Sequence, residues 1–462
     1  MGGLSATLEI SKNTLLNSQV WIQTASHNIA NADNKAYARQ KAVTVTNPPY
    51  VSQEGYLGMG ASIESVVQVR DGFIERRLID TISKEAQYQT ESSHLSSVES
   101  AIWDDGEQGL SDVLSSFWDA WEGLNKDSTG ASQKIVVTES AKSLASTIKS
   151  IYDSMVESAQ STEKEVTNAT GDVNSLLSKI ADYNSAIVAA EAGGGQPAND
   201  LRDKRYQAIT ELAEFLPVKS TEEANGAVTL TIQDNSIDIT LVSGNQAGSL
   251  QYDETAHQLT YTDYEASTYN HDSLSGGSIE GLLNVYESTG TSHDMDFVLA
   301  NPNDSSLTYL DRLNAFAYTL INNVNSTHSL AGGSNVFDAS VLGPDFNAGK
   351  ISVDSSFVPD AARALSVSDL QDQTITELGD TTFSGYLGDI QQRIGIDVKN
   401  ASSKADTQGA LRRQLEEQQQ SVSGVSIDEE LVSMLQYQQI YQAAAKMIQA
   451  TSEMLDTVIQ MV

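Results

Sequence analysis

Both ends of this chain of 462 residues carry an apolar repeat with the spacing of a coiled coil. Between Ile427 and Val462, apolar or small residues recur at alternating steps of four and three, and the same steps run from Leu4 to Ile29. A mean period of 3.5 residues is typical of a helix that buries one narrow seam against another helix. Either repeat alone also fits an amphipathic helix that docks on a globular core. Because both ends carry one, we expect the two terminal helices to pair with each other.

The residues of these two seams form the predicted assembly interface. Ser426, with Glu429 three residues later, gives the second helix an N-cap and an acidic first turn. A helix with one long apolar stripe is marginal in water unless another surface covers the stripe. The seam residues that we expect in the interface are Leu4, Leu8, Leu15, Ile22, Ile29, Leu431, Met434, Tyr441, Ile448, Leu455, Ile459 and Val462.

The charge of the chain restricts its partners. Lys and Arg number 27 against 62 Asp and Glu residues, which gives a formal net charge of -35. Such a surface repels nucleic acid and anionic membranes and favours solubility. We therefore expect neither a nucleic acid nor a membrane as partner. The chain has no cysteine, which excludes structural disulfides and zinc sites built on thiolates.

Neither a membrane span nor a cleaved leader is predicted. The apolar runs are all shorter than the roughly 20 residues that cross a bilayer. The first segment is interrupted by the charged residues Glu9 and Lys12. We therefore expect no cleaved secretory signal at the N-terminus.

The hydrophobic pattern divides the chain into helical and strand regions. The chain is longer than one core normally supports. Helical periodicity dominates from Phe73 to Leu216 and again from Leu307, whereas residues 228–261 alternate with the period of two that indicates strands. The sequence predicts an α+β fold, in which a long-helix bundle forms a rod, the terminal coiled-coil helices are discontinuous, and a β-rich domain is inserted. The predicted units are residues 1–40 with 425–462, residues 41–216 with 300–424, and residues 217–299.

Two local predictions concern the second half of the rod. The alternation over Lys350–Val353 predicts a short strand. A long helix is predicted from about Ser384 to Ser421, and it contains Gly395. Because glycine costs about 1 kcal/mol relative to alanine inside a helix, we expect this helix to start late or to bend at that residue.

The sequence shows no pattern that indicates catalysis, a cofactor or a metal. Its six histidines are scattered without the spacing of paired ligands, and the cluster His293-Asp294-Met295-Asp296 lacks the glycine and glutamate of a calcium loop. The glycine cluster at 55–60 does not have the spacing of a phosphate-binding loop, and no nucleophile elbow occurs. We therefore predict a protein that is not an enzyme, with no catalytic, cofactor-binding or metal-binding residues.

Motifs near both ends resemble those of the bacterial flagellar axial proteins, the family of rod, hook and hook-associated proteins. The segment 423–430, followed by Tyr437 and Tyr441, is similar to the C-terminal end of the hook-associated members. The segment 199–205 is similar to a run that follows a long helix in the same members. The N-terminal motif shared with the family consists of Asn28, Ile29, Ala30, Asn31, Tyr37 and Arg39.

This resemblance implies a structural subunit of the bacterial flagellum, exported by the type III route and placed at the junction of hook and filament. It implies helical self-assembly through the paired terminal helices, with copies of the chain in a ring or helical array. The implied neighbours are the flagellar hook protein and a second hook-associated protein. A small export chaperone is expected on the C-terminal helix, with its groove along Met434, Tyr441, Ile448 and Leu455.

Three alternatives are compatible with the sequence. Another flagellar axial protein, of the hook or rod type, would share the terminal motifs. A secreted coiled-coil effector or adhesin would use its seams against a host partner, but it would need neither a seam at both ends nor the Asn28–Asn31 motif. A hydrolase in the β-rich insert would require a catalytic pattern, and the sequence contains none that we recognise.

Overall fold

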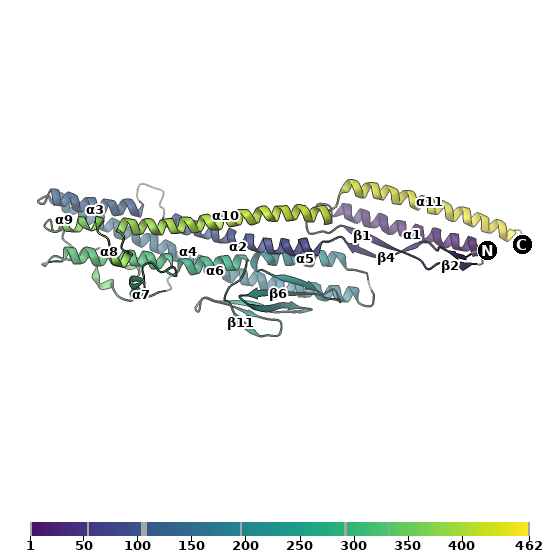
Figure 1. The fold of residues 1–462 in the computed structure, drawn as a ribbon, viewed down its shortest axis with the longest axis horizontal. Coiled ribbons are helices and arrows are strands. Elements are labelled where there is room, and N and C mark those ends of the chain that lie inside the picture. The colour runs from purple at the N-terminus through teal and green to yellow at the C-terminus, as the bar shows by residue number, and fades with distance from the viewer. Residues whose placement is uncertain are drawn as a thin grey trace.

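The computed structural model describes residues 2–52, 55–102, 109–194, 196–290, 293–330 and 332–460. The protein is elongated, with its long helices along the long axis and both termini at the same end (Figure 1). Helix α1 (Gly2–Ala30) and helix α11 (Ile427–Gln460) lie side by side at that end. We call residues 2–68 with 427–460 the terminal arm and the remaining elements the rod.

A narrow antiparallel sheet completes the terminal arm. Strand β1 (Gln40–Thr46) pairs with β4 (Ala61–Gln68), and the short strands β2 (Tyr50–Ser52) and β3 (Gly55–Leu57) pair beyond them. The side chain of Asn17 joins α1 to this sheet, because its Nδ2 donates to Ala61 O at 2.7 Å and its Oδ1 accepts from Ile63 N at 3.2 Å. Helix α1 therefore lies between the sheet and α11.

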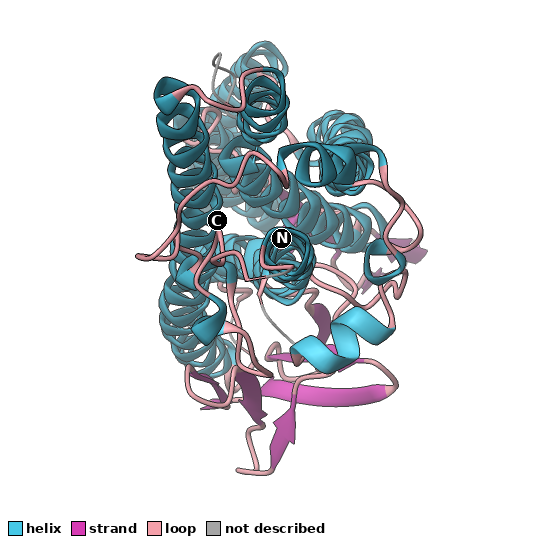
Figure 2. Ribbon diagram, turned by 90° about the vertical axis from the view of Figure 1, so that its left-hand side faces the viewer, coloured by secondary structure: helices cyan, strands magenta, loops and turns pink. Residues whose placement is uncertain are grey.

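The rod is built from helices that run alongside one another. Helix α2 (Gly72–Ile102) packs along α10 (Phe383–Ser423), and the 61-residue α4 (Ala131–Glu191) is about 90 Å long at 1.5 Å per residue. Figure 2 shows the bundle end-on, with the strands gathered on one flank. The other helices of the rod are α3 (Leu110–Lys126), α5 (Asn199–Phe215), α6 (Ser278–Thr289), α7 (Met295–Ala300), α8 (Tyr309–His328) and α9 (Ala364–Ser368).

The inserted region forms two small antiparallel sheets. One has the order β5-β6-β7-β8 and the other has the order β11-β10-β9. Their strands are β5 (Lys219–Glu222), β6 (Val228–Asp234), β7 (Ile237–Ser243), β8 (Gln246–Ala247), β9 (Ser249–Asp253), β10 (Gln258–Thr262) and β11 (Thr268–Asn270). Helix α4 holds both sheets through side chains: Asn184 Nδ2 donates to Val228 O and Gly244 O, and Asn174 Nδ2 donates to Leu250 O, all at 2.8 Å. The inserted strands therefore share apolar core with the helices of the rod.

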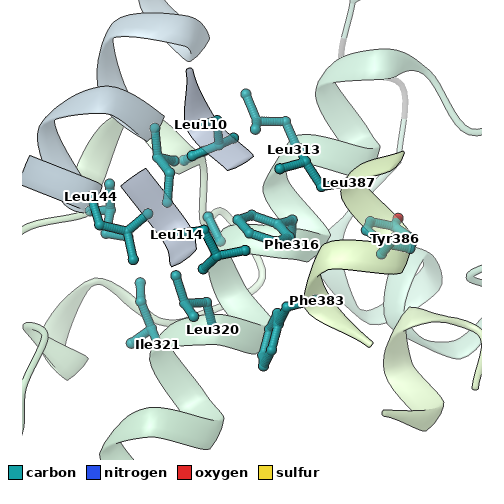
Figure 3. Close-up of a cluster of buried hydrophobic side chains, with 14 of the residues drawn as sticks. Leu110, Leu114, Leu144, Leu313, Phe316, Leu320, Ile321, Phe383, Tyr386 and Leu387 are labelled. Carbon is teal, nitrogen blue, oxygen red and sulfur yellow. The ribbon is translucent and has the colours of Figure 1, made fainter. Parts of the chain in front are cut away.

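Two apolar clusters stabilise the rod. The cluster at the end away from the termini is rich in aromatic residues, and Figure 3 shows Phe316 of α8 and Phe383 of α10 among leucines of α3 and α8. The ring centroids of Phe316 and Phe383 are 5.8 Å apart in an edge arrangement. The second cluster joins α2, α4 and α5 to the inserted sheets. Each large apolar side chain buried in this way contributes about 1.5–3 kcal/mol relative to leaving it in water.

The predicted fold class is confirmed: the chain is mostly helical, its long terminal helices pack together, and small antiparallel sheets are inserted. The predicted late start does not occur, because α10 begins at Phe383 and continues through Gly395. Ile390 and Ile394 in the adjoining turns are buried. This burial outweighs the cost of about 1 kcal/mol for one helical glycine.

The strand predicted over Lys350–Val353 does not form. Lys350 ends a short 3-10 helix, and Val353 makes only an isolated bridge with Phe337. The side chain of Asn325 accepts hydrogen bonds from the backbone N–H groups of Val336 and Phe337, at 2.8 and 2.9 Å. The N–H of Val336, which a longer ladder would direct at Asp354 O, is therefore taken by a side chain, and the bridge does not extend on that side.

Candidate assembly interface

The seam residues of α1 lie in its contact with α11 and the sheet. Leu8, Leu15 and Ile22 are partly buried, as are Leu4 and Ile29. The small seam residues Ser11, Ser18 and Ala25 are buried. Trp21 of α1 stacks on Tyr437 of α11, with their ring centroids 5.2 Å apart. The repeat near the N-terminus thus coincides with a helix that is covered by its neighbours in the arm.

Helix α11 turns a related but shifted set of residues toward α1. Four of the predicted residues, Met434, Tyr441, Ile448 and Leu455, are partly buried. They alternate along the helix with residues that the predicted seam did not include. The complete buried or partly buried repeat, again in steps of four and three, is Glu430, Met434, Tyr437, Tyr441, Ala444, Ile448, Thr451, Leu455 and Val458.

The rest of the predicted seam on α11 is open to solvent. Leu431 and Ile459 are 40% and 68% exposed, and Val462 lies outside the described residues. On the other edge of the contact with α1, Ile440, Met447 and Met454 are exposed at intervals of seven residues. We call these two rows the exposed flanks of α11. The apolar stripe of α11 is therefore wider than the surface that α1 covers.

At the root of the arm, the family motif folds into a hydrogen-bonded turn around Asn28. The amide of Asn28, which is buried, donates from Nδ2 to Gln40 O at 3.0 Å and accepts from Gln40 N at 2.9 Å. Tyr37 donates its hydroxyl proton to Asn28 Oδ1 at 2.7 Å. Burial, and then the nearby carboxylate of Asp203, raise the pKa of Tyr37, so its phenol stays protonated as a donor. The turn fixes the path of the chain from α1 into β1.

Among the other motif residues, Ile29 and Asn31 are partly buried and Ala30 is exposed. Asn31 Nδ2 donates to His27 O at 2.9 Å, which caps the end of α1. Arg39 connects the two ends of the chain. Its Nε donates to Glu430 Oε1 at 2.7 Å, and its backbone N–H donates to Ser423 O at 2.9 Å. The start of α11 is therefore attached to the N-terminal motif.

The root of the arm is also bonded to the rod through Asp203 of α5. Its Oδ1 accepts hydrogen bonds from Ala38 N at 3.3 Å, Gln68 Nε2 at 2.7 Å and Arg70 NH2 at 2.5 Å. Burial raises the pKa of Asp203 in spite of the neighbouring Arg70 cation, and its buried Oδ2 has no hydrogen-bond partner in the part of the chain that the structure describes. Burial alone would lower the pKa of Arg70, but the carboxylates of Glu75 and Asp203 raise it. This ion cluster fixes the direction in which the arm leaves the rod.

A cavity of about 240 Å³ lies beside these contacts, lined by residues 31–38, the end of α10 and Arg70 with Tyr206. Arg70 stacks on the ring of Tyr206, with its guanidinium carbon 4.5 Å from the ring centroid. Sequence reasoning did not single out Glu430, Asp203 or Arg70 as partners. The sequence did contain one signal for them: each is a charged residue inside a segment that matches a family motif. A charged side chain that becomes nearly buried needs a partner of opposite charge.

Within the described residues, no three His, Asp or Glu side chains gather closely enough to hold a metal ion. Among those residues, no helix has both the length and the apolarity that crossing a membrane requires. The prominent feature of the site is a paired-helix arm with apolar residues on the exposed flanks of α11.

The fold and the arm define the class of the protein: a rod-shaped structural subunit whose two termini form one coiled-coil arm. A family model described as the flagellar hook-associated protein FlgK helical domain matches residues 95–337, just over half of the chain. A second model, the flagellar basal body rod FlgEFG protein C-terminal, matches residues 418–461. The chain belongs to the FlgK family of flagellar hook-associated proteins.

Similar proteins extend over the whole chain. It is 26% identical to flagellar hook-associated protein 1 of Bacillus subtilis (strain 168), over 98% of this chain and 97% of that protein. It is 22% identical to the protein of the same name from Salmonella typhimurium, over 99% of this chain and all of that protein. The fold resembles the flagellar hook junction protein FlgK from Burkholderia pseudomallei, with a TM-score of 0.59 and 13% identity, over 75% of this chain and all of that chain.

Membership of this family confirms the predicted function at the level of class. The protein is a structural component of the flagellum at the hook-filament junction, outside the cell. The family is structural and not enzymatic, in agreement with the prediction from sequence. Membership of the family also implies partners in the axial assembly of the flagellum.

Proposed function

We propose that copies of this chain assemble through their terminal arms into a ring or helical array that adapts the hook to the filament. The observation that supports this proposal is the pair of exposed flanks of α11. Ile440, Met447 and Ile459 are at least 38% exposed, although they flank a packed helical seam. Exposed apolar rows beside a packed seam favour association, and the arm of a neighbouring copy carries the same repeat.

We further propose three units: residues 1–40 with 425–462, residues 41–216 with 300–424, and residues 217–299. In the array, residues 1–40 with 425–462 form the inner layer around a central export channel. Residues 41–216 with 300–424 form the rod outside this layer, and residues 217–299 face outward. The contacts of Arg39 with Ser423 and Glu430 support the first boundary, because both ends of the chain enter the arm at that point. The sheets on one flank of the rod support an outward-facing third unit (Figure 2).

The neighbours that we propose are the hook protein on one side and a second hook-associated protein on the other. The names of the similar proteins, hook-associated protein 1 and hook junction protein, support a place next to the hook. Tyr50, Val51, Tyr56 and Leu57, on the hairpin of β2 and β3, are 41–77% exposed and lie at the tip of the arm. This tip is a second apolar surface for a neighbour in the same layer.

We also propose a small export chaperone on α11. The groove expected along Met434, Tyr441, Ile448 and Leu455 would meet the face that α1 covers in this fold. A chaperone on that face must displace α1. Hydrogen exchange of the monomer tests this: binding should speed exchange across residues 2–30 while it slows exchange across residues 427–460. Binding that leaves the exchange of α1 unchanged would place the chaperone on the exposed flanks instead.

Electron microscopy of hook stubs with added protein tests the assembly role. The variant Ile440→Glu with Met447→Glu introduces charge on one exposed flank, and Gln442→Glu with Gln449→Glu introduces the same charge on the opposite face. Both variants should melt like the natural protein, because all four positions are exposed. We expect only the first to lose its ability to cap hooks, since a carboxylate is costly to bury in an apolar contact. Normal capping by the first variant would contradict the proposal.

A further inference from the structure

An open cavity of about 400 Å³ lies at the end of the rod away from the terminal arm, between α10 and the start of α8. Two arginines line it, Arg312 from α8 and Arg393 from α10. Among the described residues neither arginine makes an ion pair, although the chain holds 62 acidic residues. The cavity thus contains positive charge that the described part of the chain does not neutralise by direct contact.

Arg312 is 5% exposed, and its hydrogen bonding is incomplete. Its NH2 donates to Asp304 O at 2.8 Å and its NH1 approaches Pro302 O at 3.5 Å, whereas its buried Nε has no hydrogen-bond partner among the described residues. Burial, followed by the nearby Arg393 cation, lowers the pKa of Arg312. A buried guanidinium that faces a second one is unfavourable unless an anion joins them.

Tyr386 contributes a second buried polar group without a partner. The residue is 3% exposed and lines the same cavity. Its buried hydroxyl lies beside the Arg312 guanidinium but meets no acceptor for its proton within the described structure. Figure 3 shows Tyr386 at the margin of the apolar cluster, on the side away from Leu110 and Leu144. A buried hydroxyl without an acceptor is unfavourable, because its desolvation is not compensated. Two such donors on one cavity indicate a missing acceptor.

The carboxylates on the cavity do not fill this role. Asp397 already accepts a hydrogen bond from the hydroxyl of Tyr309 at 2.6 Å. Asp389 is exposed on the surface of α10 and makes no ion pair among the described residues. The acceptor that would satisfy Arg312 Nε and the Tyr386 hydroxyl must therefore come from outside this chain.

We propose that this cavity binds a carboxylate or similar small oxyanion, held by Arg312, Tyr386 and Arg393. Two oxygens on one atom match the planar fork of a guanidinium, and a third contact to the phenol fixes the orientation of the group. The oxyanion comes either from solution or from an acidic side chain of a neighbouring copy. Both sources present the same chemical group, and the experiments below distinguish them.

Binding to the monomer is measured first by calorimetry and thermal melting, with sodium succinate or phosphate against sodium chloride of equal ionic strength. We expect a saturable signal and a higher melting temperature with either oxyanion. Arg393→Gln should weaken binding on the order of tenfold, whereas Lys399→Gln, which removes an exposed cation from the same helix, should not change it. Absence of saturable binding, or equal binding by Arg393→Gln, would overturn the proposal.

Tyr386→Phe supplies a second test, in which the charge of the protein does not change. In chloride buffer this variant should melt at a higher temperature than the natural protein, because it removes a buried hydroxyl that has no acceptor. It should also bind succinate more weakly. A lower melting temperature in chloride would show that the hydroxyl already has a partner, and it would refute the site.

Labelled succinate then identifies the source of the anion in the assembly. Protein seated on hook stubs is compared with free monomer by equilibrium dialysis. Retention of the bound succinate in the assembly indicates an anion from solution. Binding that is present in the monomer and absent after assembly indicates that an acidic side chain of a neighbouring copy has taken its place. Binding in neither state would contradict the proposal.

Discussion

Arg39 and Glu430 stand 391 positions apart in the sequence and share a hydrogen-bonded ion pair, with Nε 2.7 Å from Oε1. The Glu430 side chain is 5% exposed and the Arg39 side chain is 36% exposed, so solvent reaches the cation but hardly reaches the carboxylate. The pair fastens the first turn of α11 to the N-terminal motif. It is the point at which the two ends of the chain become one arm.

Arg39→Gln should loosen the arm without loosening the rod. It leaves the buried carboxylate of Glu430 without its cation, at a cost of about 1–3 kcal/mol in the stability of the arm. Hydrogen exchange should become faster over residues 2–30 and 427–460 and stay unchanged over 144–187. Glu430→Gln is the matched control and should cost less, because it removes the charge that requires a partner. Faster exchange throughout the rod would contradict a local role for the pair.

Tyr37→Phe tests the turn at the root of the arm. The change removes the hydroxyl that donates to Asn28 Oδ1, while the two hydrogen bonds between Asn28 and Gln40 can remain. We expect a loss of about 1 kcal/mol in the free energy of unfolding, measured by denaturant titration. Asn28→Ala removes all three bonds and should cost clearly more. An equal cost for the two variants would mean that the backbone contacts to Gln40 contribute little.

Leu455→Asp and Ile459→Asp separate pairing within the chain from contact between copies. Leu455 is partly buried toward α1, whereas Ile459 is 68% exposed. A carboxylate at 455 must be desolvated in the monomer, so we expect faster exchange across α1 and α11. The same change at 459 should leave the exchange of the monomer unaltered and reduce the capping of hooks. If both variants behave alike in the monomer, the division of α11 into covered and exposed faces is wrong.

The stability of the inserted sheets should depend on pH through His271. This side chain, which is 9% exposed, bridges Asp234 Oδ2 at 3.1 Å and Glu280 Oε2 at 3.3 Å, and its Nδ1 also meets the Tyr261 hydroxyl. Burial alone would lower the pKa of His271, but the carboxylates of Glu280 and Asp234 outweigh it and raise the pKa above 6.5. The stabilisation is therefore complete below pH 6.5 and is lost as pH rises through the higher folded pKa.

Melting curves of the natural protein and His271→Gln check this direction. The difference between them should be largest near pH 6 and should shrink at alkaline pH, where the imidazole no longer carries a charge. His94→Gln, at a partly buried ion pair between α2 and Glu165 of α4, is the matched control and should not reproduce the effect on the sheets. A difference that grows as pH rises would show that His271 is held neutral in the native protein.

The sequence was sufficient for the features that repeat locally. The steps of four and three at both ends predict two one-sided helices, because the position of a side chain around a helix follows from the backbone alone. The family motif around Asn28 and Arg39 predicts the axial class of protein for the same reason: it is a short, continuous segment. Periodicity also identified the long helices and the inserted strands.

Only the tertiary structure decided which edge of each stripe is covered. Helix α11 carries apolar residues at more positions than one partner can bury, so Tyr437 and Ala444 face α1 while Leu431 remains open. The direction from which α1 approaches is set by contacts far apart in the sequence, including Arg39 with Glu430 and Asp203 with Ala38. The sequence of one helix shows how often apolar residues recur, but it does not show from which side the partner helix approaches. That side depends on how distant segments of the chain are bonded together.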